Sequence, residues 1–173
     1  MMGSFPPARK RWSMDFFYPN FINDMWRIYG LCFFGDKEHF VDAAARSFRK
    51  EELERFLQEK GVALFDTATA IVRTTGTASD KDLEVVEPTD IDALLRQIPQ
   101  CRAVVTTGQK ATEVFMAHFS VEKLPMGTYS PFMFEGREIR LYRMPSSSRA
   151  YPMKVERKAD FYRQMFKEIG LLA

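Results

Sequence analysis

The chain has 173 residues, 46% of them apolar and 28% charged, and a net charge of +2, an ordinary composition for a soluble globular protein. Its length fits one domain covering residues 1–173. No run of 18 apolar residues predicts a membrane span, and the first twelve residues lack the apolar segment of a secretory signal. Two cysteines, two histidines and no pair at ligand spacing argue against a metal site and favour a reduced, cytoplasmic setting.

The charges are distributed unevenly along the chain. Residues 1–12 and 137–158 together hold ten cations and two acids, a net charge of +8, whereas the other residues hold 15 cations and 21 acids, a net charge of −6. A basic face on an acidic body is a plausible footprint for a polyanion. The alternative is that both segments are solvated ends of the molecule.

The spacing of apolar residues predicts helices and strands in alternation. We expect a helix that begins near Asn20 or Asn23, then a helix over 47–61, a buried strand over 62–66, a helix over 89–98, a buried strand over 101–108 and a helix over 109–119. Two strands around Glu135-Gly136 and a final helix over 155–172 follow. Residues 67–88 show no strong period.

Local signals predict where these helices begin and end and which face they bury. Ser47 and Thr89 are candidate N-caps, and Gly61 follows the second helix as a stop signal. In the last helix, Phe161, Met165, Ile169 and Leu172 form the expected buried stripe.

Strands that alternate with helices indicate an α/β fold. We expect a three-layer α/β/α sandwich with a mostly parallel central sheet and helices on both faces. Ligands of such folds bind beyond the carboxyl ends of the strands. The stretches at predicted strand ends are residues 67–80, 107–110 and 144–151, and residues 3–12 would be a fourth if a strand precedes them.

Three of these stretches carry groups that suit a nucleic acid, and each also has a simpler interpretation. The segment "PSSSRAY" (145–151) offers hydroxyls and an arginine to phosphate, or is a polar turn. The aromatic residues of "FFYPNFINDMW" (16–26) could stack on a base beside an asparagine that reads it, or could be core residues. The junction "TTGQK" (106–110) could hold an anion at a helix start, although close packing at Gly108 explains the glycine equally well.

In this order the motifs resemble the uracil-DNA glycosylase superfamily, and most closely its mismatch-specific and hypoxanthine-DNA glycosylase branches. The resemblance covers nearly the whole chain. It is carried by six short motifs: "GSFPPA", "FFYPNFINDMW", "GVALFD", the loop "TTGTASDKD" (74–82), "TTGQKA" and "MPSSSRAY".

The resemblance implies a monofunctional DNA glycosylase for base-excision repair that flips a deaminated base, hypoxanthine or uracil, out of DNA and hydrolyses its N-glycosidic bond. Its partner would be DNA with a damaged or mismatched base, and no metal or cofactor is expected. We expect a monomer located in the cytoplasm, associated with the nucleoid if the source is bacterial.

The resemblance also assigns roles to individual residues. Asn23 is the catalytic candidate, which would hydrogen-bond the base and support its departure. The base pocket would be formed by Gly3, Ser4, Phe5, Pro6, Phe17 and Tyr18, with Tyr18 the better-aligned stacking residue. The DNA-binding residues would be Arg9, Lys10, Arg11, Pro145, Ser146, Ser147, Ser148 and Arg149, with Arg149 filling the space left by the flipped base.

Three positions depart from the superfamily pattern. Phe5 stands where most members carry the Asp or Asn that orients the attacking water, although the hypoxanthine-like branch shares this departure. Met144 stands where a His or Asn often precedes the proline, and Tyr151 stands where the hypoxanthine branch tends to have Asn. Catalysis would therefore rely on Asn23, or the chain would be a nucleic-acid-binding module with little or no activity.

Two further expectations concern the start of the chain and its ligand class. Members of the superfamily have a central strand before the first motif, whereas only Met1 and Met2 precede Gly3 here, so we expect a truncated first strand or an upstream start. The remaining alternative is a flavodoxin-like domain that binds another phosphate-bearing small molecule.

Overall fold

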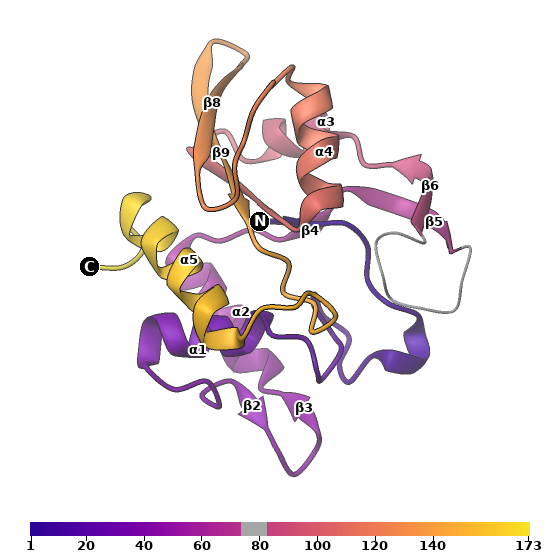
Figure 1. Ribbon diagram of the computed structural model, residues 1–173, viewed down its shortest axis with the longest axis vertical. Helices are drawn as coiled ribbons and strands as arrows, with labels where there is room; N and C mark the ends of the chain where they lie inside the picture. Colours follow the sequence, from indigo (N-terminus) through magenta and orange to yellow (C-terminus); the bar gives the residue numbers. More distant parts are fainter. Residues whose placement is uncertain (74–82) are drawn as a thin grey trace. The chain divides into compact units, whose positions relative to one another are not determined.

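The computed structural model describes residues 1–73 and 83–173 (Figure 1). Its backbone contacts divide the chain into two compact units, one formed by Met1–Phe5 with Phe65–Pro145 and the other by Pro6–Leu64 with Ser146–Ala173. The single domain over 1–173 stays a prediction, and the two units are described in turn.

The first unit contains a five-stranded sheet in the order β4-β1-β7-β9-β8. Its strands are β1 (Met2–Gly3), β4 (Phe65–Asp66), β7 (Ala103–Thr107), β8 (Tyr129–Phe134) and β9 (Arg137–Met144). All neighbouring strands are parallel except β8, which pairs antiparallel with β9. The mixed α/β class with a mostly parallel sheet is confirmed, whereas the three-layer arrangement stays a prediction.

Strand β1 is short, and it lies inside the sheet. Met2 pairs with Phe65 of β4 on one side and with Thr106 of β7 on the other. The position expected for a strand before the first motif is therefore occupied by Met2 and Gly3, which are both buried.

The antiparallel β8–β9 hairpin forms where the sequence predicts it. Glu135 and Gly136 at its turn have positive φ angles of 47° and 80°, the conformation that a tight hairpin turn requires and that glycine adopts readily. Ile139 and Leu141 of β9 are fully buried, so the alternation confirms the expected inward face.

Helices α3 (Ile91–Gln97) and α4 (Gln109–His118) share the core of the first unit with the sheet. That core consists of Met2, Ile91, Leu95, Val104, Phe115, Leu124, Phe132, Phe134, Ile139 and Leu141. The buried strand before Gly108 and the helix after it are both confirmed.

Two strands of this unit were not expected. Strands β5 (Ala68–Arg73) and β6 (Leu83–Pro88) form an antiparallel ribbon in the stretch that shows no sequence period. The motif "TTGTASDKD" (74–82) lies outside the described residues. The buried strand expected over 62–66 is wrong in part, because only Phe65 and Asp66 form a strand and Phe65 remains 37% exposed at the edge of the sheet.

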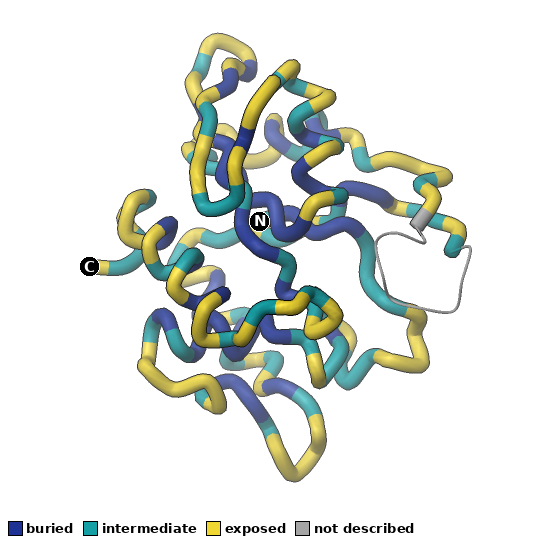
Figure 2. The backbone as a smooth tube through the Cα atoms, in the orientation of Figure 1, coloured by how far each residue is buried: buried dark blue, intermediate teal, exposed yellow. Residues whose placement is uncertain are grey.

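The second unit contains helices α1 (Met25–Phe34), α2 (Lys50–Lys60) and α5 (Val155–Glu168), the short ribbon of β2 (Val41–Asp42) with β3 (Ser47–Phe48), and the 3-10 helix η1 (Arg9–Arg11). Helices α1 and α5 pack together (Figure 1). Aromatic rings form the core: the ring of Tyr29 lies 5.2 Å from that of Phe166, and the ring of Phe33 lies 5.0 Å from that of Phe56. Figure 2 shows the buried inner faces of these helices.

Three local predictions for the helices are wrong in detail. Ser47 does not cap α2 because it lies in β3, where its hydroxyl donates to the carbonyl of Ser13 at 2.8 Å. Asp90 caps α3 instead of Thr89, whose hydroxyl donates to the carbonyl of Asp66 at 2.6 Å. Helix α5 buries Lys158, Ala159, Tyr162, Met165 and Phe166, so the stripe predicted for it is rotated and only Met165 belongs to both sets.

Candidate functional site

The segment that precedes α1 is closed into a loop by its own hydrogen bonds. Both the backbone amide and the hydroxyl of Ser13 donate to the carbonyl of Pro19, at 2.8 and 2.7 Å. Between them Tyr18 has a φ of 50°, a left-handed conformation that a tyrosine adopts only under constraint from its surroundings. The loop therefore holds the candidate stacking residue in a defined backbone geometry.

Trp26 in the first turn of α1 is the anchor of this loop. Its indole is fully buried and donates to the carbonyl of Phe17 at 3.1 Å. The ring of Tyr18 meets the indole edge-on at 5.8 Å, and the ring of Phe16 stacks on it at the same distance. The half-buried Tyr18 ring is thus supported from behind by a rigid aromatic residue.

Asn23 has an oriented side-chain amide at the start of α1. Its Oδ1 atom accepts the backbone amide of Met25 at 2.9 Å, an Asx turn that satisfies one of the first amides of the helix. Because Oδ1 is engaged in this way, the Nδ2 group is the part of the amide that remains to donate to a ligand. Within residues 1–73 and 83–173, no protein atom accepts a hydrogen bond from it.

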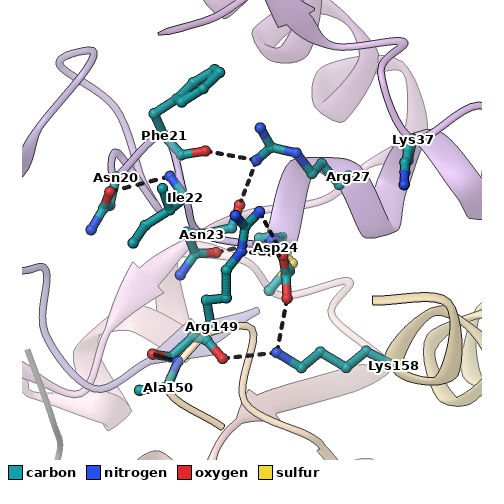
Figure 3. A network of polar contacts seen from close by, with 12 residues as sticks. Asn20, Phe21, Ile22, Asn23, Asp24, Arg27, Lys37, Arg149, Ala150 and Lys158 are labelled. Atoms are coloured by element: carbon teal, nitrogen blue, oxygen red, sulfur yellow. Dashed lines mark hydrogen bonds and ion pairs between the residues drawn. The ribbon is translucent and has the colours of Figure 1, made fainter. Parts of the chain in front are cut away.

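Asp24 is the centre of a network that joins three segments of the second unit (Figure 3). Its backbone amide donates to the carbonyl of Ser147 at 2.9 Å. Its carboxylate is only 5% exposed and accepts from Lys158 at Oδ2, 3.0 Å away, and from Arg149 at Oδ1, 3.3 Å away. Asp24 therefore connects the start of α1 with the second-motif loop 146–149 and with α5.

Lys158 is the buried partner in this network. Its side chain has no exposed surface, and its ammonium donates to the carboxylate of Asp24 and, at 2.8 Å, to the carbonyl of Ser148. Leaving one partner of such a pair unpaired in the interior costs about 3–5 kcal/mol. The Arg149 side chain is 51% exposed, and a pair this accessible to solvent contributes about 1 kcal/mol or less.

The serines of the second motif use their oxygens mainly within their own loop. Ser146 Oγ accepts the amide of Ser148 at 3.2 Å, and Ser148 Oγ accepts the amide of Ala150 at 3.3 Å. Ser147 is buried. The polar-turn interpretation of this segment accounts for these contacts, and the hydroxyl hydrogens of Ser146 and Ser148 remain donors that could serve a phosphate.

A third cation, Arg27, adds to the positive charge around Asp24. It is 8% exposed and donates to the carbonyls of Phe21 and Asn23, at 2.7 and 3.1 Å. Burial, and next the charge of Arg149, lower the pKa of Arg27. Arg27 thereby fixes the backbone of the residue that carries the candidate amide, and it repels Arg149.

The basic cluster of the first motif lies on η1. Arg9, Lys10 and Arg11 are exposed, and the guanidinium of Arg9 lies 4.3 Å above the Trp12 ring and 3.5 Å from the carboxylate of Asp15. Such exposed cations can reach a polyanion with little rearrangement.

The remaining predicted pocket residues are divided between the two units. Gly3, Ser4, Phe5 and Pro145 belong to the first unit, where Gly3 pairs with Asp66 in β1 and Ser4 is buried. Pro6, Phe17, Tyr18, Asn23, Ser146, Ser147, Ser148 and Arg149 belong to the second unit. The structure brings Asn23, Tyr18 and the second-motif loop together through Trp26 and Asp24, and the role of residues 3–5 stays a prediction.

Sequence reasoning missed Asp24, Arg27 and Lys158. Lys158 stands four and seven residues before Tyr162 and Met165, so it continues the buried stripe of α5. A lysine on such a stripe predicts a buried carboxylate partner. That signal was available, whereas the identity of the partner, 134 residues earlier, was not.

Two searches of the described residues concern metals and membranes. Across residues 1–73 and 83–173, no cluster of three or more His, Cys, Asp and Glu side chains could hold a metal ion. In the same ranges, no helix has both the length and the apolar character that crossing a bilayer requires.

Comparisons with known proteins give a likeness of fold. No model of a known protein family matches the chain, and a search of curated protein sequences gives no significant match. Among solved structures, it is similar to the NMR structure of a putative uracil DNA glycosylase from Methanosarcina acetivorans, with a TM-score of 0.55 and 20% sequence identity over 95% of this chain and 89% of that one. The protein thus has a fold like that of this uracil DNA glycosylase-like structure.

Proposed function

We propose that this protein is a monofunctional DNA glycosylase that hydrolyses the N-glycosidic bond of a deaminated base, uracil or hypoxanthine, in DNA. The observation that carries the proposal is the side-chain amide of Asn23, whose Oδ1 is held by Met25 while Nδ2 remains to donate. The likeness of fold to a putative uracil DNA glycosylase supports the same class of reaction.

The proposed chemistry follows from the leaving group. Uracil and hypoxanthine carry a carbonyl oxygen where cytosine and adenine carry an amino group. As the glycosidic bond breaks, the sugar gains oxocarbenium character and the base gains negative charge, part of it on this oxygen. A fixed amide donor stabilises that charge more than it stabilises the neutral ground state, and it cannot pair with an amino group in the same place.

The other residues would hold the substrate. The base is flipped out of the duplex and stacks on the ring of Tyr18, which Trp26 supports. Arg9, Lys10, Arg11 and Arg149 contact backbone phosphates, together with the hydroxyls of Ser146 and Ser148. The reaction uses no metal or cofactor.

One observation favours a second candidate, a DNA-binding module of the same fold with little or no activity. Phe5 and Met144 stand where a water-orienting group and a second donor to the base are expected, and neither side chain can supply such a hydrogen bond. The two candidates share DNA binding and differ in base release.

Single-turnover base release tests the proposal. Labelled oligonucleotides with one uracil, hypoxanthine or xanthine, single-stranded and opposite each normal base, are incubated with excess protein in EDTA. We expect alkali-labile abasic sites to form from at least one uracil or hypoxanthine substrate and not from undamaged DNA. No release from any substrate, with salt-sensitive DNA binding intact, would favour the binding module.

A further inference from the structure

The carboxylate of Asp24 has two cationic partners of different character. Lys158 is fully buried and donates both to Asp24 and to the carbonyl of Ser148, so its ammonium is held at two points. Arg149 is half exposed, and its Nε and Nη2 atoms both approach the same oxygen, Oδ1, at 3.4 and 3.3 Å. Charge-assisted bonds of good geometry are shorter than this.

The balance of charge around Asp24 favours the departure of one cation. Lys158 alone neutralises the buried carboxylate. The Arg149 guanidinium also lies close enough to Arg27 to lower its pKa, which places two like charges near each other. If Arg149 turns outward, the buried Asp24–Lys158 pair stays neutral and that repulsion is relieved.

We propose that Lys158 is the permanent counter-ion of Asp24 and Arg149 its exchangeable one, so that Arg149 leaves Asp24 for a DNA phosphate without stranding a buried charge. This inference rests on the DNA binding of the proposed function. It makes Lys158 a positioning residue, which touches no DNA itself, and it makes Asp24 a competitor that restrains Arg149 until a phosphate is present.

Salt-dependent binding to a short undamaged duplex tests the exchange, because each phosphate contact contributes about 0.9 to the slope of log K against log salt. We expect Arg149→Gln to lower the slope by about 0.9 and the affinity roughly eightfold at 0.1 M salt. The double variant Asp24→Asn/Lys158→Met keeps the net charge and removes the competing carboxylate. It should keep the slope of the unchanged protein and bind up to about fivefold more tightly, the factor that corresponds to an exposed ion pair.

The single variant Lys158→Met gives the opposite result. Asp24 then has Arg149 as its one cation in this network and retains it, so the slope should fall to that of Arg149→Gln although Arg149 is present. Adding Arg149→Gln to the double variant should abolish its tighter binding. Thermal unfolding of each variant checks that the fold is kept, and Arg149→Gln with the double variant suffices if Lys158→Met alone does not fold.

The outcomes separate this inference from the proposed function. If Arg149→Gln leaves the slope unchanged, or if the double variant shows the lower slope, Arg149 does not exchange and the inference fails while DNA binding stands. If the unchanged protein shows no salt-dependent binding to the duplex, the proposed function fails and the inference fails with it.

Discussion

The Oδ1 atom of Asn23 accepts the backbone amide of Met25 at 2.9 Å. One half of this amide therefore belongs to the start of α1, and the other half, Nδ2, remains to donate to a ligand. Capping and chemistry are carried by different atoms of the same side chain. The two roles can be separated by substitution, because aspartate keeps the acceptor and loses the donor.

The Asp24–Lys158 pair should dominate the stability of the second unit. We expect Lys158→Met to lower the free energy of unfolding by about 3 kcal/mol, because it leaves a carboxylate that is 5% exposed with only the half-exposed Arg149. The double variant Asp24→Asn/Lys158→Met should recover most of this loss, since no buried charge remains. Urea unfolding measures both. Lys167→Met, on the exposed face of the same helix, should change the value by about 0.5 kcal/mol or less, and equal losses in the single and double variants would contradict the pairing.

The chain approaches itself closely at Gly30 of α1. A Cβ atom added there would lie 2.2 Å from the carbonyl oxygen of Asp36, so the backbone would have to move. We expect Gly30→Ala to cost about 1–3 kcal/mol. Gly35 is the matched control: it has a φ of +68° and open space around it, so asparagine should be tolerated with a smaller loss. Similar unfolding midpoints for the two variants would contradict this account.

Asp66 at the end of β4 should make stability depend on pH. Burial raises the pKa of Asp66 to about 6 from its ordinary value of 3.8. The folded protein then binds this proton more tightly than the unfolded chain, so the contribution of Asp66 to stability falls as the pH rises from about 4 to about 6. The difference corresponds to at most about 3 kcal/mol.

The matched variant for this effect is Asp66→Asn, which cannot ionise. Its unfolding free energy should exceed that of the unchanged protein at pH 7 and approach it at pH 4. The opposite order, with the larger difference at pH 4, would contradict a raised pKa for Asp66.

The cations of η1 should contribute to DNA affinity without regard to base identity. Changing Arg9, Lys10 and Arg11 together to glutamine should lower the salt slope of duplex binding by about 2–3 and weaken all duplexes alike. The control changes Arg55, Lys123 and Lys167, which are exposed as well and remove the same charge. If the control lowers the slope as much, the effect belongs to net charge and η1 is not a contact surface.

Much of the fold could be predicted because its signals are local. The apolar run before Gly108, the helix after it and the Glu135-Gly136 turn each specify their structure within a few residues. The misplaced caps have distant causes: the Ser47 hydroxyl bonds to Ser13, and the Thr89 hydroxyl bonds to Asp66. The β5–β6 ribbon escaped prediction because cross-strand pairing, and not a strong apolar period, defines it.

The candidate site shows the same division. Asn23 and Tyr18 could be proposed from a short motif, but their supports could not. Lys158 reaches Asp24 across 134 positions of sequence, and no local pattern names that partner. The rotated stripe of α5 has the same origin, because a lysine occupies a core position there that the apolar count assigns to other residues.

The most direct test of the account is the single-turnover rate of base release from the best uracil or hypoxanthine substrate, compared between the unchanged protein and Asn23→Asp. Aspartate keeps the acceptor for Met25, so the variant should retain its thermal stability, whereas Asn23→Ala should lose about 1 kcal/mol. Because the donor is replaced by a negative charge facing the departing base, we predict that Asn23→Asp releases the base at least a hundredfold more slowly. An unchanged rate in a folded Asn23→Asp variant would show that Asn23 only caps its helix and would contradict the proposed mechanism.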